Sequence, residues 1–333
     1  RQQAMYCVES GQAQMVIGTH ALFQEEVVFD RLGLIIVDEQ HRFGVHQRLK
    51  LMEKGMQDDV RPHQMIMTAT PIPRTLAMSV YADLDTSIID ELPPGRQPVT
   101  TVVIPEERRD EVIQRVAQAC EQGRQVYWVC PLIEESEALQ AQAATETEVL
   151  LQSQLDGIRI QLIHGRLKPQ EKEQIMQAFK QGEIDLLVAT TVIEVGVDVA
   201  NASLMIIENA ERLGLSQLHQ LRGRVGRGSA QSSCVLMYRS PLGDIARERL
   251  AIMHETTDGF EIAQRDLEIR GPGEVLGTRQ TGLLELRIAD LMRDQALMPR
   301  VVEASKQIFT QHPEMIEPLL QRWLKQGLQF AEV

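Results

Sequence analysis

The sequence lacks the features that mark several large classes of protein. No apolar run approaches the roughly 18 residues that a membrane-spanning helix needs, and no signal peptide is visible. The four cysteines form neither a CxxC pair nor a zinc-ligand spacing, which predicts reduced thiols in a cytoplasmic protein. Positive charge is also scarce, because the formal net charge is −13 at pH 7. That balance argues against a surface that is basic throughout and binds nucleic acid everywhere.

Basic residues are nevertheless concentrated in two places. Residues 212–228 contain four arginines and no acid, and residues 40–52 contain Arg42, Arg48 and Lys50, again without an acid. A local basic patch can bind phosphates even where the net charge is negative.

The order of apolar segments predicts an α/β protein with parallel sheets covered by helices. Helix-period segments alternate with short runs that are apolar throughout, a pattern typical of strands buried on both faces. The predicted strands are Met15–Ile17, Leu34–Val37, Met65–Thr68, Val99–Ile104, Val126–Val129, Ile158–Ile163, Asp185–Thr190, Leu204–Ile207 and Cys234–Tyr238. The predicted helices are 45–54, 73–81, 106–121, 136–152 and 169–180.

The Pro- and Gly-rich stretch ELPPGRQP, residues 91–98, is the predicted linker, because it can continue neither a helix nor a central strand. We therefore expect domains at 1–95 and 96–240, followed by a mostly helical region at 241–333.

Two carboxylates, Asp38 and Glu39, directly follow the apolar run 34–37. Functional groups gather at the carboxyl ends of strands in open parallel sheets. One acid there can hold Mg²⁺ and its neighbour can orient or deprotonate a water molecule. The alternative is an ordinary strand that ends in polar residues.

A second strand end carries Thr68, Ala69 and Thr70, ahead of a helix that begins near Pro73. Threonine hydroxyls can bond a neighbouring carboxylate or a phosphate, although Thr70 can also serve as a simple helix N-cap.

A third segment, SQLHQLRGRVGRG at 216–228, predicts a helix with Gln220, Arg224 and Arg227 along one stripe. Guanidinium groups aligned in this way suit phosphate oxygens. Glycine in a helix interior costs roughly 1 kcal/mol, so we expect a close approach of some other group to Gly223 and Gly226 as the compensation. The alternative is a solvated basic helix that ends at Gly226.

A phosphate-binding loop of the form GxxxxGK[ST] is missing, since the chain contains no Gly-Lys dipeptide. The chain also begins with Arg1 and not with Met, so we expect the loop to lie upstream in a longer protein.

These motifs together resemble those of superfamily 2 helicases. VDEQH (37–41), TATPIPRT (68–75), VATTVIEVGVDV (188–199) and QLHQLRGRVGR (217–227) are similar to motifs II, III, V and VI. GTHAL (18–22) resembles the motif Ib element, and RDLEIRGPGEVLGTRQTG (265–282) resembles the translocation motif of the RecG and Mfd families. DEQHRFGVHQR and GTRQTG are more similar to RecG than to Mfd.

The resemblance implies two RecA-like domains, the first incomplete here, that bind ATP with Mg²⁺. It implies that Asp38 coordinates the metal with Glu39, which also activates water, and that Arg224 and Arg227 act as arginine fingers with Gln220 beside them. Further roles are implied for larger sets. The residues implied to relay the nucleotide state are Gln40 and His41. The residues implied to couple ATP hydrolysis to movement along DNA are Thr68, Ala69, Thr70, Arg265, Arg270, Arg279 and Gln280. Those on the DNA or nucleotide face are Gly18, Thr19, His20, Thr190, Thr191, Glu194, Gly196 and Asp198.

The function implied is an ATP-dependent translocase or helicase that remodels branched and double-stranded DNA in recombination and repair. The resemblance also implies a monomer in the bacterial cytoplasm, with single-strand-binding protein as a candidate partner. Two alternatives stay open at this point: a transcription-repair coupling translocase of the Mfd type, and a DNA- or protein-binding fragment that does not hydrolyse ATP.

Overall fold

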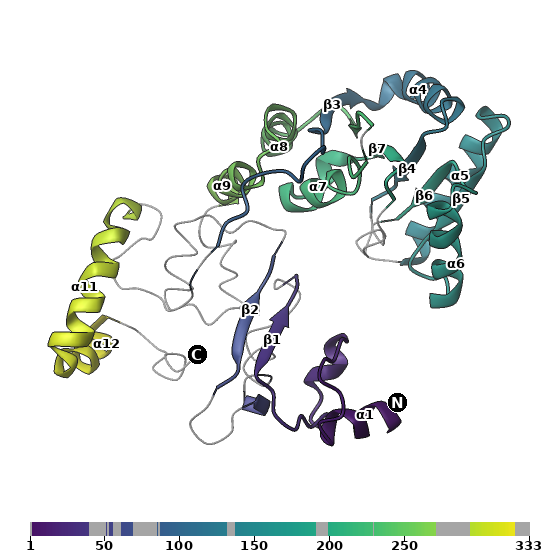
Figure 1. The fold of residues 1–333 in the computed structure, drawn as a ribbon. Coiled ribbons are helices and arrows are strands. Elements are labelled where there is room, and N and C mark those ends of the chain that lie inside the picture. The colour runs from purple at the N-terminus through teal and green to yellow at the C-terminus, as the bar shows by residue number, and fades with distance from the viewer. Residues whose placement is uncertain are drawn as a thin grey trace. The chain divides into compact units, whose positions relative to one another are not determined.

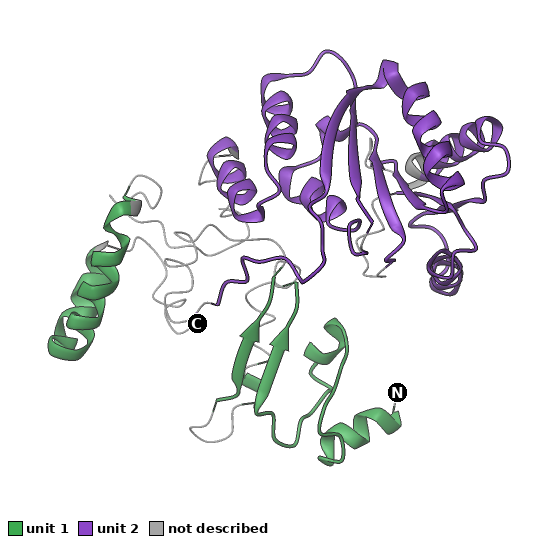
Figure 2. Cartoon of the chain, turned by 45° about the horizontal axis from the view of Figure 1, so that its top comes forward, with its two compact units in different colours: residues 1–82, 272–333 green, residues 83–271 purple. Residues whose placement is uncertain are grey.

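The chain forms two compact units in a computed structural model. Unit 1 comprises residues 1–82 and 272–333, and unit 2 comprises residues 83–271 (Figure 2). The structure describes residues 2–39, 51, 53–55, 61–68, 85, 87–131, 137–190, 199–228, 230–270 and 294–323. None of the helices in these ranges is long and apolar enough to span a membrane.

Unit 2 is built on a sheet of six parallel strands in the order β3-β8-β7-β4-β6-β5. Figure 1 labels β3, β4, β5, β6 and β7 of this sheet. The strands are β3 (Thr100–Pro105), β4 (Gln125–Val129), β5 (Ile160–Ile163), β6 (Leu186–Ala189), β7 (Ala202–Ile207) and β8 (Ser233–Tyr238). Every residue of β4, β6 and β7 is buried, which is why their sequences are mostly apolar without alternation; the two polar residues, Gln125 and Ser203, are buried as well. The prediction of a parallel sheet covered on both faces is confirmed for this unit.

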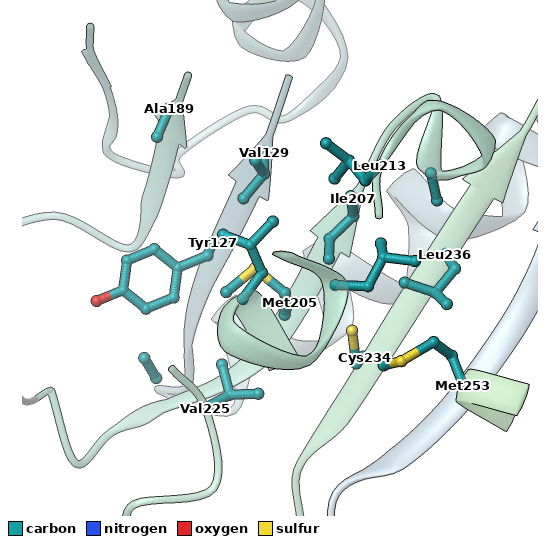
Figure 3. Packing of buried hydrophobic residues seen from close by; sticks show 14 of the residues in the cluster. Tyr127, Val129, Ala189, Met205, Ile207, Leu213, Val225, Cys234, Leu236 and Met253 are labelled. Atoms are coloured by element: carbon teal, nitrogen blue, oxygen red, sulfur yellow. The ribbon is translucent and has the colours of Figure 1, made fainter. Parts of the chain in front are cut away.

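Two cores cover the two faces of this sheet. On one face, Tyr127 and Val129 belong to one core with Leu218 of α7 (Leu215–Arg222) and Leu250 of α8 (Asp244–Glu255). Figure 3 shows Tyr127 and Val129 beside Met205 of this core. On the other face, Val126 and Trp128 pack against α4 (Arg109–Glu121) and α5 (Glu137–Gln154). The alternation along β4 follows from the pleat, which turns successive side chains to opposite faces. The remaining elements of unit 2 are α6 (Pro169–Lys180), α9 (Gly259–Arg270), η3 (Glu106–Arg108) and η5 (Ala210–Arg212).

Unit 1 contains a two-stranded parallel sheet of β1 (Leu34–Val37) and β2 (His63–Ile66). Ile35 and Val37 are buried, whereas Leu34 and Ile36 are more than half exposed. In the described part of unit 1, the face of β1 that carries Leu34 and Ile36 is therefore exposed, whereas the face that carries Ile35 and Val37 is covered. The other elements are α1 (Gln2–Glu9), η1 (His20–Phe23), η6 (Gln295–Leu297), α11 (Met298–Gln311), η7 (Pro313–Met315) and α12 (Ile316–Trp323).

Most of the predicted elements are present within one or two residues of their predicted bounds. The strand predicted at Met15–Ile17 is wrong: these residues form no strand, and Met15 and Ile17 are 77% and 88% exposed. An apolar run of three residues does not make a strand without a partner to complete its hydrogen bonds. The helix predicted at 73–81 lies outside the described residues, and of that at 45–54 only residues 51, 53 and 54 are described, all helical.

The predicted domain boundaries near residues 95 and 240 stay a prediction. By compactness, residues 241–271 group with the six-stranded sheet. The packing of Leu250, Met253 and Ile262 into the core of that sheet accounts for this grouping.

Candidate nucleotide site

In unit 1, Asp38 and Glu39 follow β1 and Thr68 follows β2 at the same edge of the sheet. The pairing aligns Val37 with Ile66, and the Met67 amide donates to the Val37 carbonyl over 2.8 Å. The carboxylates and the Thr68 hydroxyl group are therefore carried by neighbouring strand ends, as the order of the motifs predicted.

The backbone turns sharply between the two carboxylates. Glu39 has a φ of 52°, in the left-handed region, and its amide donates to Asp38 Oδ1 over 2.9 Å. A residue with a side chain rarely adopts this conformation, which is often found at functional sites. The turn leaves Asp38 exposed and Glu39 half-buried, so the two acids have different environments.

The donor set at this edge fits Mg²⁺ bound together with phosphates. Mg²⁺ usually takes one or two carboxylates and keeps water or phosphate oxygens as its other ligands. Asp38 supplies such a carboxylate. The described residues contain no group of three or more His, Cys, Asp or Glu placed to hold a metal by themselves.

In unit 2, the carboxyl ends of the central strands carry Thr190, Glu208 and Cys130. Thr190 follows β6, is buried, and donates its amide to the Ile163 carbonyl over 3.2 Å. Burial raises the pKa of the Cys130 thiol, with a further contribution from the Glu208 charge. Cys130 is therefore a protonated core residue and no nucleophile.

Glu208 anchors a cluster that the sequence motifs did not predict. Its Oε1 accepts a hydrogen bond from Trp128 Nε1 over 2.7 Å and pairs with Arg109 Nη2 at 2.5 Å. The Arg109 guanidinium lies 5.3 Å from the centre of the Trp128 ring. The acid directly after the apolar run 204–207 is the sequence signal that could have revealed Glu208, since the same pattern singled out Asp38. The cluster fastens α4 to the end of β7.

The predicted helical stripe of Gln220, Arg224 and Arg227 is wrong. Helix α7 ends at Arg222, Gly223 is its C-cap, and Gly226 has a φ of +77°. Only Gln220 is helical; Arg224 and Arg227 lie in the loop that follows. That loop, residues 223–228, is termed the arginine loop below. The periodic pattern failed because two glycines three residues apart end a helix more readily than they interrupt one.

The close approach expected of these glycines holds for Gly226. A Cβ at Gly226 would lie 2.7 Å from Val99 Cγ2. A Cβ at Gly228 would lie only 2.3 Å from the Ala200 carbonyl oxygen, so that glycine also permits a close backbone crossing. Gly223 meets only its own helix at 3.4 Å, an ordinary contact.

Arg222, which resembles the neighbouring arginines in sequence, is an internal anchor. It is 3% exposed, and its Nη1 donates to the carbonyl oxygens of Met253 and Thr256. Burial lowers the pKa of its guanidinium. Because Arg222 lies seven residues after the buried Leu215 and four after the buried Leu218, helical spacing could have predicted it to face the core.

The other predicted residues are placed as follows. Gly18, Thr19 and His20 are exposed around the start of η1, where the Thr19 carbonyl accepts from the Leu22 amide over 3.0 Å. Arg265 is exposed on α9, and Arg270 is the last residue of that helix. Ten predicted residues lie outside the described part of the chain: Gln40, His41, Ala69, Thr70, Thr191, Glu194, Gly196, Asp198, Arg279 and Gln280.

Comparison with known proteins agrees with the order of these elements. Residues 1–79 match the DEAD/DEAH box helicase family, and residues 108–229 match the family described as helicase conserved C-terminal domain. Residues 256–329 match the family described as ATP-dependent DNA helicase RecG, domain 3, C-terminal. The ATP-dependent DNA helicase RecG of Pasteurella multocida (strain Pm70) is 66% identical over 327 residues. Over 98% of its length, this chain is thus similar to a RecG protein.

Other RecG relatives agree. The RecG helicase of Escherichia coli (strain K12) is 63% identical over 325 residues, which are 97% of this chain and 47% of that protein. A solved structure of RecG bound to a three-way DNA junction superposes with a TM-score of 0.66 at 45% identity, over 89% of this chain and 37% of that one. The chain covers 47% of the Pasteurella RecG, so it spans about half the length of these relatives. The RecA-like fold class is thereby confirmed, and the RecG match at 256–329 favours RecG over the Mfd alternative.

Proposed function

We propose that this protein is an ATP-driven translocase of double-stranded DNA that remodels branched DNA, such as stalled forks and Holliday junctions, in recombination and repair. The observation that carries the proposal is the similarity of 89% of the chain to a RecG protein bound to a three-way DNA junction. We also assign the protein to the bacterial cytoplasm at the nucleoid, as a monomer, with single-strand-binding protein as a partner.

Within this proposal, unit 1 contributes the acids. Asp38 holds Mg²⁺ with ATP, Glu39 orients and deprotonates the attacking water, and Gln40 and His41 relay the state of the nucleotide. Magnesium, when bound, neutralises phosphate charge. The sharp turn at Glu39 supports these roles, because it directs two adjacent carboxylates differently from one strand end.

Unit 2 contributes the arginines. Arg224 and Arg227 neutralise the charge that develops on the transferred phosphoryl group, which is the largest contribution that a protein makes to this chemistry. Their place in a loop and not on a helix supports this role, since a loop can present both guanidinium groups without helical spacing. Thr68, Ala69, Thr70, Arg265, Arg270, Arg279 and Gln280 couple hydrolysis to movement. Gly18, Thr19, His20, Thr190, Thr191, Glu194, Gly196 and Asp198 face DNA or nucleotide.

The experiment that tests the proposal measures ATP hydrolysis by the full-length protein with and without forked DNA. We expect Asp38→Asn to lower the rate of DNA-stimulated ATP hydrolysis at least about 100-fold, because the metal loses its charged ligand. Fork binding should stay nearly intact. The matched control is Asp30→Asn, which changes another exposed acid of unit 1 that pairs with its neighbour Arg31. Undiminished hydrolysis in Asp38→Asn would overturn the assignment.

We further propose that the 333-residue chain by itself binds DNA without hydrolysing ATP, because it contains no Gly-Lys dipeptide with which to hold the phosphates. The same assay on this chain decides the matter. Turnover by the chain alone would contradict this second proposal.

A further inference from the structure

The predicted linker is ordered along unit 2 and ends in the six-stranded sheet. The Arg96 amide donates to the Pro93 carbonyl over 3.1 Å, and Gly95 has a φ of +82°. This is a β-turn with glycine at the position that requires a positive φ. The Thr100 amide then donates to the Ser232 carbonyl over 3.0 Å as β3 pairs with β8. The stretch from Pro93 to Thr100 is therefore held at both ends.

Between those ends, the linker contacts the arginine loop. Arg96 Nε donates to the Gly226 carbonyl oxygen over 3.0 Å, across 130 positions of sequence. The contact is half-buried, and a charged donor makes such a hydrogen bond stronger than one between neutral groups. Gly226 also packs against Val99 so closely that a Cβ would lie 2.7 Å from Val99 Cγ2. The linker thus provides one wall of the arginine loop.

The bonded carbonyl belongs to the peptide group that joins Gly226 to Arg227. Holding that oxygen restrains the plane of the peptide and so the position of Arg227 N and Cα, from which the Arg227 side chain leaves the backbone. The φ of +77° at Gly226 is otherwise easily changed, because glycine has no Cβ to restrict it. A second constraint comes from the other side, where Gly228 passes the Ala200 carbonyl.

We propose that Arg96 is a positioning residue that acts through Arg227: it holds the Gly226 carbonyl and thereby sets the direction of the arginine finger. The inference rests on the proposed function, in which Arg227 acts on the phosphoryl group. Arg96 itself contacts no substrate. It connects the linker to the arginine loop, so a change in the path of the linker is transmitted to Arg227.

The test measures kcat and KM for ATP with the full-length protein at saturating forked DNA. We expect Arg96→Ala to lower kcat about 10- to 100-fold with KM for ATP changed less than about threefold, since misdirecting a transition-state group affects kcat. Arg96→Lys should recover most of the loss, because an ammonium group can donate to the same carbonyl. The control is Arg159→Ala, which removes another guanidinium that donates to a glycine carbonyl, that of Gly182, over 2.8 Å. The control should keep its kcat.

A double-mutant cycle separates positioning from a general structural role. If Arg96 acts through Arg227, the double variant Arg96→Ala/Arg227→Ala should have the residual kcat of Arg227→Ala alone. If the factors by which the two single substitutions lower kcat multiply in the double variant, the inference is overturned. An Arg96→Ala variant with the wild-type kcat would also overturn it. A wild-type protein without DNA-stimulated hydrolysis, or an Arg227→Ala variant with full activity, would instead overturn the proposed function, and this inference with it.

Discussion

Arg222 Nη1 lies 2.9 Å from the carbonyl oxygen of Thr256 and joins the end of α7 to the end of α8. The same nitrogen donates to the Met253 carbonyl over 3.1 Å and to Thr101 Oγ1 over 3.3 Å. A buried guanidinium thus satisfies carbonyl oxygens at the last turn of a helix, where no amide of that helix can reach them. This contact fastens α8 to the element that precedes the arginine loop.

We expect Arg222→Ala to lower the free energy of unfolding by about 2–4 kcal/mol. The variant loses several charge-assisted hydrogen bonds and leaves buried carbonyl oxygens without a donor. The shift in the midpoint of urea unfolding measures the loss. Arg212→Ala is the matched control, because Arg212 is about half exposed and its ion pair with Glu211 spans 3.8 Å; it should change stability by less than about 0.5 kcal/mol. Equal stability of the two variants would contradict the anchoring role.

The stability of unit 2 should depend on pH through His219. Burial, and to a smaller extent the nearby Arg222 charge, lower the pKa of its imidazole to about 4, against the opposing effect of Asp258. The unfolded chain binds a proton near pH 6.5, whereas the folded chain resists it. Stability should therefore be complete above about pH 6.5 and fall as the pH decreases towards 4, by on the order of 3 kcal/mol in all.

Urea midpoints recorded from pH 7.5 to 4.5 test this dependence. In His219→Gln the side chain does not titrate, so the part of the acid sensitivity that begins near pH 6.5 should disappear. An unchanged pH profile in that variant would assign the acid sensitivity to other groups.

Gly228→Ala should disturb the arginine loop directly. The added Cβ would lie 2.3 Å from the Ala200 carbonyl oxygen, a backbone atom that moves only with its chain. We expect a loss of at least about tenfold in the rate of DNA-stimulated ATP hydrolysis by the full-length protein, because small misplacements of charged groups are costly in catalysis. Gly243→Ala is the control, since a Cβ there meets nothing within 4 Å. A Gly228→Ala variant as active as this control would show that the loop tolerates the shift.

The sequence by itself determined the strands of the six-stranded sheet and their order along the chain. Runs such as LLVA in β6 and LMII in β7 are apolar throughout because both faces of those strands are buried, so their pattern indicates a covered parallel sheet. The carboxylates after β1 could be predicted for the same local reason, since a change from apolar to acidic residues marks the end of a strand. The order of the motifs along the chain likewise indicates the RecG family, because each motif is a short continuous run of residues.

Helical spacing indicates that Arg222 faces the core, but only the tertiary structure decided which carbonyl oxygens it binds and that Arg224 and Arg227 lie in a loop. Arg222 and Arg224 are two residues apart and chemically identical, yet one is buried among carbonyl oxygens and the other lies beyond the end of α7. The hydrogen bond from Arg96 to Gly226 was likewise unpredictable, because it joins residues 130 positions apart. Local sequence determines hydrogen bonds within a helix or turn, but the partner of a distant side chain depends on how the elements pack.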